Sequence, residues 1–71
     1  MTNKEMLELK IFQSGKTKTH LAQACGLSYQ GFFNCLNNKA EFNTTQVKIL
    51  CGELGISSLK EKEAIFFANL G

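Results

Sequence analysis

The sequence predicts an all-α protein, built as a compact five-helix domain. Apolar residues recur at helical spacing in five segments, and each segment follows a residue that can cap the N-terminus of a helix. Glycine ends most of these segments, and the chain contains no proline. Its 71 residues suffice for one modest core. We therefore expect a single domain over residues 1–71.

The first expected helix covers residues 3–13. Thr2 precedes it and Glu5 follows three residues later, which is the spacing of a capping box. Ser14 and Gly15 mark its end, because glycine readily adopts the left-handed C-cap conformation. Its inward residues are expected to be Leu7, Ile11 and either Met6 or Phe12.

The second and third helices are expected at residues 18–25 and 29–37, with Thr17 and Ser28 as their N-caps. Only Gly26 and Leu27 lie between the first helix of this pair and the cap of the next, so the two helices must cross steeply. The residues expected to face the core are Leu21, Ala22, Ala24 and Cys25 in the second helix and Phe32, Cys35 and Leu36 in the third.

The fourth helix is expected at residues 44–54, with Asn43 and Gln46 as a capping pair. Its inward stripe is Val47, Leu50, Cys51 and Leu54. The fifth, at residues 59–69, opens with Ser58 and Glu61 as a capping box. This helix has two apolar sides, of which one holds Leu59, Phe66 and Leu70, with Phe67 at its edge, and the other holds Ile65.

One stretch within this pattern carries a family signature. Counted from Lys18, alanine stands at the fifth place and glycine at the ninth, as Ala22 and Gly26. Ala22 must be small where the next helix crosses it, and Gly26 relieves a strained turn. The apolar places four, eight, ten, fifteen and eighteen hold Leu21, Cys25, Leu27, Phe32 and Cys35.

With this pattern, residues 18–37 resemble the helix-turn-helix of the Cro and repressor family, the lambda-repressor-like DNA-binding proteins of phages and bacteria. The flanks SGKTKTHLA and NTTQVKILCGELGIS extend the resemblance over most of the chain. It implies a Cro-type repressor that binds double-stranded operator DNA and blocks polymerase by occupying the operator. It also implies a homodimer on DNA, for which the two-sided fifth helix offers Ile65, Phe66 and Phe67, unless the core of so small a domain needs all three.

The outward arc of the third helix is made of amides, hydroxyls and aromatic rings. The residues expected to read bases are Ser28, Tyr29, Gln30, Phe33, Asn34 and Asn37. Glutamine and asparagine can pair with adenine N6 and N7, and an aromatic ring can contact thymine methyl groups. Because the chain has no arginine, which most often reads guanine, we expect half-sites that contain A·T pairs.

Two residues in this helix leave alternatives open. Phe33 could contact bases or complete the core beside Leu36. Gly31 costs a helix about 1 kcal/mol relative to alanine. It either allows the backbone to approach DNA or the second helix, or is a tolerated defect.

Polar residues at helix ends around this arc are expected to contact phosphates and to set the register on DNA. They are Lys16, Thr17, Lys18, Thr19, Asn38, Lys39, Asn43 and Thr44. The formal net charge of +2 permits nucleic-acid binding without demanding it. For any one of these lysines taken alone, the sequence slightly favours a merely solvated role.

Other functions find little support in the residues. The chain has no aspartate, one histidine, no glycine-rich phosphate loop and no nucleophile beside a base, so we expect neither an enzyme nor a cofactor. Three cysteines without a CxxC pair predict reduced thiols rather than a metal site or disulfides. We expect a cytoplasmic protein without a membrane span or small-molecule ligand. The alternative function is a helical protein-interaction module, such as an antirepressor, that uses this fold without specific DNA binding.

Overall fold

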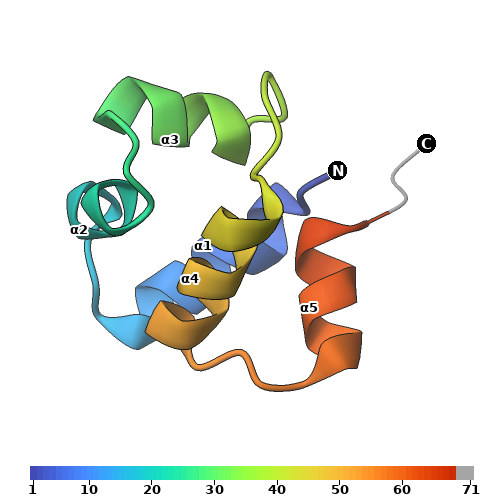
Figure 1. The fold of residues 1–71 in the computed structure, drawn as a ribbon. Coiled ribbons are helices and arrows are strands. Elements are labelled where there is room, and N and C mark those ends of the chain that lie inside the picture. The colour runs from blue at the N-terminus through green and yellow to red at the C-terminus, as the bar shows by residue number, and fades with distance from the viewer. Residues whose placement is uncertain (69–71) are drawn as a thin grey trace.

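Five helices build the structure, a computed structural model that describes residues 1–68 and contains no strand within them. They are α1 (Lys4–Ser14), α2 (Lys18–Ala24), α3 (Tyr29–Leu36), α4 (Thr44–Leu54) and α5 (Leu59–Phe66). In Figure 1, α1 and α4 occupy the middle, α2 and α3 lie on one side of them, and α5 lies on the other. The prediction of a compact, all-helical protein with five helices is confirmed.

Local capping explains where the helices begin. The side chains of Thr17, Ser28, Asn43 and Ser58 each accept a hydrogen bond from the backbone N–H three residues further on, as predicted. At Asn43 the capping box is reciprocal, because the Gln46 side chain also accepts from the Asn43 N–H.

The expected cap of α1 is wrong by one residue. Asn3 caps this helix, and its Oδ1 accepts from the Met6 N–H at 3.2 Å. Thr2 is buried, with 4% of its surface exposed, and its backbone is bound to another part of the chain. The end of α1 is as predicted, since Gly15 has φ +72° and its N–H donates to the Phe12 carbonyl.

The inward faces of α1 to α4 meet in one apolar core. Leu7, Leu21, Phe32, Leu36 and Leu50 are at most 1% exposed. The expected stripes are confirmed apart from Ala24, Met6 and Cys51, which are only partly buried, and Phe12, which is 82% exposed. These helices owe their positions to burial of apolar area, which stabilises a fold by about 25 cal/mol per Å².

Phe42, in the loop between α3 and α4, connects the two sides of the core. Its ring meets Phe32 of α3 edge-on, with centroids 5.6 Å apart, and Phe66 of α5 edge-on at 6.0 Å. Edge-to-face pairs at such distances add about 0.5–1.5 kcal/mol beyond burial. Phe42 therefore links α3 to α5, because its ring contacts both Phe32 and Phe66.

The structure shows which apolar residues of α5 are buried. Ile65 is 0% and Phe66 4% exposed, whereas Leu59 is 66% exposed. The helix ends at Phe66, and Asn69 and Leu70 lie outside the described residues. Because this helix has two apolar sides, its pattern alone did not decide which side is buried. Packing against α1 decides it, together with a hydrogen bond of 2.6 Å from the Asn3 N–H to the Ile65 carbonyl.

Asn38 fixes the first residues of the chain against the end of α3. Its Oδ1 accepts from the Thr2 N–H at 2.8 Å, and its Nδ2 donates to the Thr2 carbonyl at 2.9 Å. Asn38 is the one non-glycine residue among the described ones with positive φ, at 62°. Asparagine tolerates this left-handed conformation better than most residues. This Thr2–Asn38 clasp places the start of α1 beside α3.

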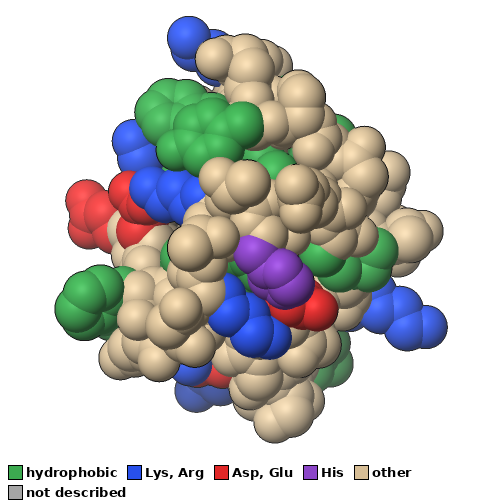
Figure 2. All heavy atoms as spheres, turned by 90° about the vertical axis from the view of Figure 1, so that its left-hand side faces the viewer, with side chains coloured by type: hydrophobic (Ala, Val, Ile, Leu, Met, Phe, Trp, Pro, Cys, Tyr) green, Lys and Arg blue, Asp and Glu red, His purple; other side chains and the backbone are tan. Residues whose placement is uncertain are grey.

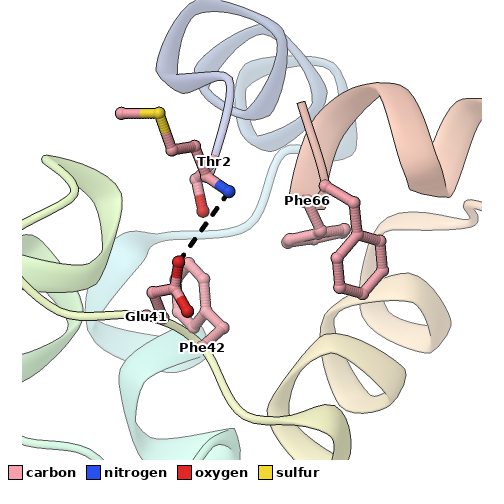
Figure 3. A pocket seen from close by; sticks show the side chains of 6 residues that line it. Thr2, Glu41, Phe42 and Phe66 are labelled. Carbon is pink, nitrogen blue, oxygen red and sulfur yellow. Dashed lines mark ion pairs between the residues drawn. The ribbon is translucent and has the colours of Figure 1, made fainter. Parts of the chain in front are cut away.

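A small pocket lies next to the clasp (Figure 3). Its volume is about 50 Å³, and its lining residues are Met1, Thr2, Glu41, Phe42, Phe66 and Phe67. The amino group of Met1 lies 3.9 Å from a carboxylate oxygen of Glu41 across its mouth (Figure 3). Such a volume suits one or two water molecules rather than an organic ligand.

Candidate nucleic-acid interface

The outward side of α3 is a polar and aromatic surface on a helix whose inner side is buried. Phe32, Cys35 and Leu36 anchor its inner side, and each is at most 4% exposed. On the outer side Tyr29 is 52% and Phe33 40% exposed, and their rings stack at a centroid distance of 6.4 Å. Phe33 is therefore not a core residue, which removes one of the two interpretations offered by the sequence.

The turn before α3 sets its direction. Gly26 adopts φ +71°, and the Leu27 N–H donates to the Ala22 carbonyl at 2.9 Å. Ala22 is 1% exposed under the crossing of α2 and α3, as expected for a position that must be small. The two helices pack closely and cross steeply, as Figure 1 shows.

Gly31 has a local role that the sequence did not indicate. A Cβ atom at this position would lie 3.2 Å from the Ser28 Oγ, which is tighter than most contacts of a Cβ atom. That same Oγ accepts the N-cap hydrogen bond from the Gly31 N–H at 3.0 Å. The absence of a side chain thus leaves room for the cap of α3, and the nearest atoms belong to Ser28 and Leu27 rather than to α2.

Gln30 and Asn34 are joined rather than independent. Gln30 Nε2 donates to Asn34 Oδ1 at 3.0 Å, one helical turn away. Gln30 is exposed and Asn34 is partly exposed, so both amides remain accessible from solvent.

Lys4, which no sequence pattern singled out, joins this surface from α1. Its Nζ donates to Asn37 Oδ1 at 2.7 Å and lies 6.0 Å from the centroid of the Phe33 ring. Asn37 in turn donates through Nδ2 to the Phe33 carbonyl at 2.9 Å. The Asn37 amide is therefore occupied, and Lys4 supplies a positive charge at this end of α3. Since Lys4 and Asn37 are 33 residues apart, local sequence patterns carry no signal for the contact.

The residues expected to contact phosphates fall into two groups. Lys16 pairs with Glu53 and Lys18 with Glu8, while Thr17, Asn38 and Asn43 use their side-chain oxygens in caps or in the Thr2–Asn38 clasp. The second group has exposed side chains that form no hydrogen bond or ion pair within residues 1–68. It consists of Thr19, Lys39 and Thr44.

Glu53 organises the charges at the start of α2. Its Oε1 accepts from Lys16 Nζ at 3.0 Å and lies 2.7 Å from His20 Nε2. Lys16 also donates to the Glu53 backbone carbonyl at 2.8 Å. The hydrogen bond from Lys16, followed by that from His20, lowers the pKa of the Glu53 carboxyl. The Glu53 carboxylate therefore pairs with Lys16, whose ammonium group was expected to contact a phosphate.

The charge distribution around α3 is mixed. Figure 2 views the molecule from the side that carries α2 and α3, and basic side chains there lie next to acidic ones rather than forming one positive field. Apolar side chains are also exposed in several places on this face. Phosphate attraction by this face is accordingly weaker than the lysine count suggests.

Three residues of α5 and its end were expected to form a dimer interface, and only one of them is exposed in the structure. Ile65 and Phe66 are 0% and 4% exposed, because both complete the core of the single chain, and only Phe67 is exposed, at 58%. The expected dimer contact through Ile65 and Phe66 is therefore corrected.

Three further observations concern the described residues as a whole. None of the helices in residues 1–68 combines the length and apolar character that a membrane span requires. In the same part of the chain, no three histidine, cysteine or glutamate side chains gather as potential metal ligands. Comparisons of the chain with protein-family models, curated proteins and solved structures give no match.

Proposed function

We propose that this protein binds double-stranded DNA sequence-specifically, with α3 in the major groove, and that it represses transcription by occupying an operator. The observation that carries the proposal is the outer face of α3, where two amides and two stacked rings are exposed on a helix whose other side is buried. A major groove admits one helix, and amides and apolar groups are what read A·T pairs there. The resemblance of residues 18–37 to the Cro helix-turn-helix points the same way.

Lys39 and Lys4 supply the phosphate contacts in this arrangement. Lys39 lies in the loop after α3 and forms no ion pair within the described residues, and Lys4 lies beside the C-terminal end of α3. Each lysine that neutralises a phosphate makes the binding constant fall more steeply with salt, by about 0.9 in the logarithmic slope. With few free lysines, we expect a shallow slope and modest nonspecific affinity.

The test is selection from a randomised duplex pool, followed by fluorescence anisotropy on the selected and scrambled duplexes between about 0.05 and 0.2 M salt. We expect one selected sequence, bound more tightly than its scrambled form. Lys39→Ala should reduce the slope by about 0.9, and Lys60→Ala, the same change on α5 away from α3, should leave it unchanged. Selection of no sequence, with equal slopes for both variants, would refute the proposal.

A second candidate function is a protein-interaction module built on the same face. The mixed charges in Figure 2 and the exposed rings of Tyr29 and Phe33 favour this alternative. Interfaces between proteins are enriched in aromatic residues and depleted of lysine. If the pool yields no sequence, Tyr29 and Phe33 are the side chains to substitute in a search for a protein partner.

A further inference from the structure

We propose that Gln30 and Asn34 read a single adenine together, as one composite amide, rather than one base each. This inference rests on the proposed DNA binding and specifies how the α3 face selects its sequence. It starts from the hydrogen bond of 3.0 Å that already joins the two side chains in the absence of DNA.

The bond determines which hydrogen-bonding groups remain. Gln30 Nε2 donates to Asn34 Oδ1, so Gln30 Oε1 and Asn34 Nδ2 have no partner within residues 1–68. One is an acceptor and the other a donor. Rotating both amides by 180° would exchange the roles of the two residues but would again leave one donor and one acceptor. In either orientation, one carbonyl oxygen and one amino group of the pair therefore have no internal partner.

This pair of groups matches the major-groove edge of adenine. Adenine offers the N7 acceptor beside the N6 amino donor, whereas guanine offers two acceptors, N7 and O6. Facing guanine, the free carbonyl oxygen of the composite would meet another acceptor. Two independent amides would have more free N–H donors and could each bind a different base. The hydrogen bond between them therefore reduces the number of bases that the two residues can recognise.

The pairing also prepares the two side chains before DNA arrives. Glutamine is among the side chains that lose most rotamer freedom when they are fixed, and a bond formed in the free protein reduces the loss that remains on binding. The stacked rings of Tyr29 and Phe33 lie at the same helical spacing beside the amides and offer an apolar surface to thymine methyl groups.

The variants Gln30→Ala, Gln30→Met, Asn34→Ala and the double alanine variant test the proposal on the duplex that the wild-type protein selects. Gln30→Met preserves side-chain length, and helical circular dichroism verifies that each variant folds. Gln13→Ala serves as the matched control, because Gln13 is an exposed amide near the opposite end of α1 from Lys4.

We expect each single variant to lose discrimination at the same A·T position, by about 10- to 100-fold, and the double variant to lose little more. Replacing that adenine by 7-deazaadenine or by purine, which lack N7 or the 6-amino group, should weaken wild-type binding. Each single variant should respond little to either replacement, because the remaining amide has lost the partner that positions it.

Three results would overturn the inference. If the two variants relax different base pairs additively, or if the shared position prefers G·C, the residues do not act as an adenine reader but specific DNA binding stands. If neither variant changes any position, α3 reads DNA without these amides. If the wild-type protein selects no sequence at all, the proposed function fails and this inference fails with it.

Discussion

Replacing Asn38 by alanine is expected to destabilise the protein far more than its surface position suggests. The change removes the hydrogen bonds of 2.8 and 2.9 Å that join the Asn38 amide to both backbone groups of Thr2. Each contributes about 0.5–1.5 kcal/mol. Alanine must also adopt the left-handed conformation, at a cost of about 1 kcal/mol. The free energy of unfolding should fall by about 3 kcal/mol in total.

Two further variants separate these contributions in urea denaturation followed by circular dichroism. Asn38→Gly loses the hydrogen bonds but adopts φ 62° without strain, so its loss should be about 1 kcal/mol smaller. Asn37→Ala is the matched control, since its bonds lie at the exposed surface, and it should lose less than about 1 kcal/mol. A loss for Asn38→Ala no greater than that for Asn37→Ala, or equal to that for Asn38→Gly, would refute this account of the clasp.

Three other outcomes follow from the charged and buried groups. Glu53→Gln should free the Lys16 charge and steepen the salt dependence of DNA binding by about 0.9 in anisotropy titrations, and an unchanged slope would place Lys16 away from DNA. The lowered pKa of Glu53 means that its ionised form stabilises the fold. The difference in urea midpoint between wild type and Glu53→Gln should therefore be present at about pH 7 and disappear as the pH falls below about 4, whereas a difference that persists in acid would contradict this origin. Burial raises the pKa of the Cys25 and Cys35 thiols, so mass spectrometry should find both resistant to iodoacetamide until urea unfolds the protein, and rapid alkylation of the folded protein would contradict their burial.

Local rules made the middle of the fold predictable. The caps Thr17, Ser28 and Asn43 act within three residues of themselves, and the inward stripes of α2, α3 and α4 follow from helical spacing. For the same reason the composition of the outer face of α3 could be predicted. Thr2 and Asn3 are both able to cap α1, but Asn3 is the cap, and the Thr2 N–H donates to the distant Asn38 instead.

Long-range contacts account for what could not be predicted. The two apolar sides of α5 are nearly equivalent in sequence, and packing against α1 selects the side of Ile65. Local patterns also could not show which site residues are free to contact DNA, because the partners of these residues lie far away in the sequence. Lys16 meets Glu53 of α4, and Asn38 meets Thr2, each across more than thirty positions.

The contact between Asn3 and Ile65 has a consequence for the order in which the protein folds during its synthesis. The Asn3 N–H donates to the Ile65 carbonyl at 2.6 Å, and the Ala68 N–H donates to the Met1 carbonyl at 2.9 Å. The backbone groups of Met1 and Asn3 therefore find these partners only after α5 and Ala68 have been synthesised. Closing a loop of this length is entropically costly and delays long-range contacts. We expect α2 and α3, which contact each other across a short turn, to pair early, and α5 to fix residues 1–3 in place later.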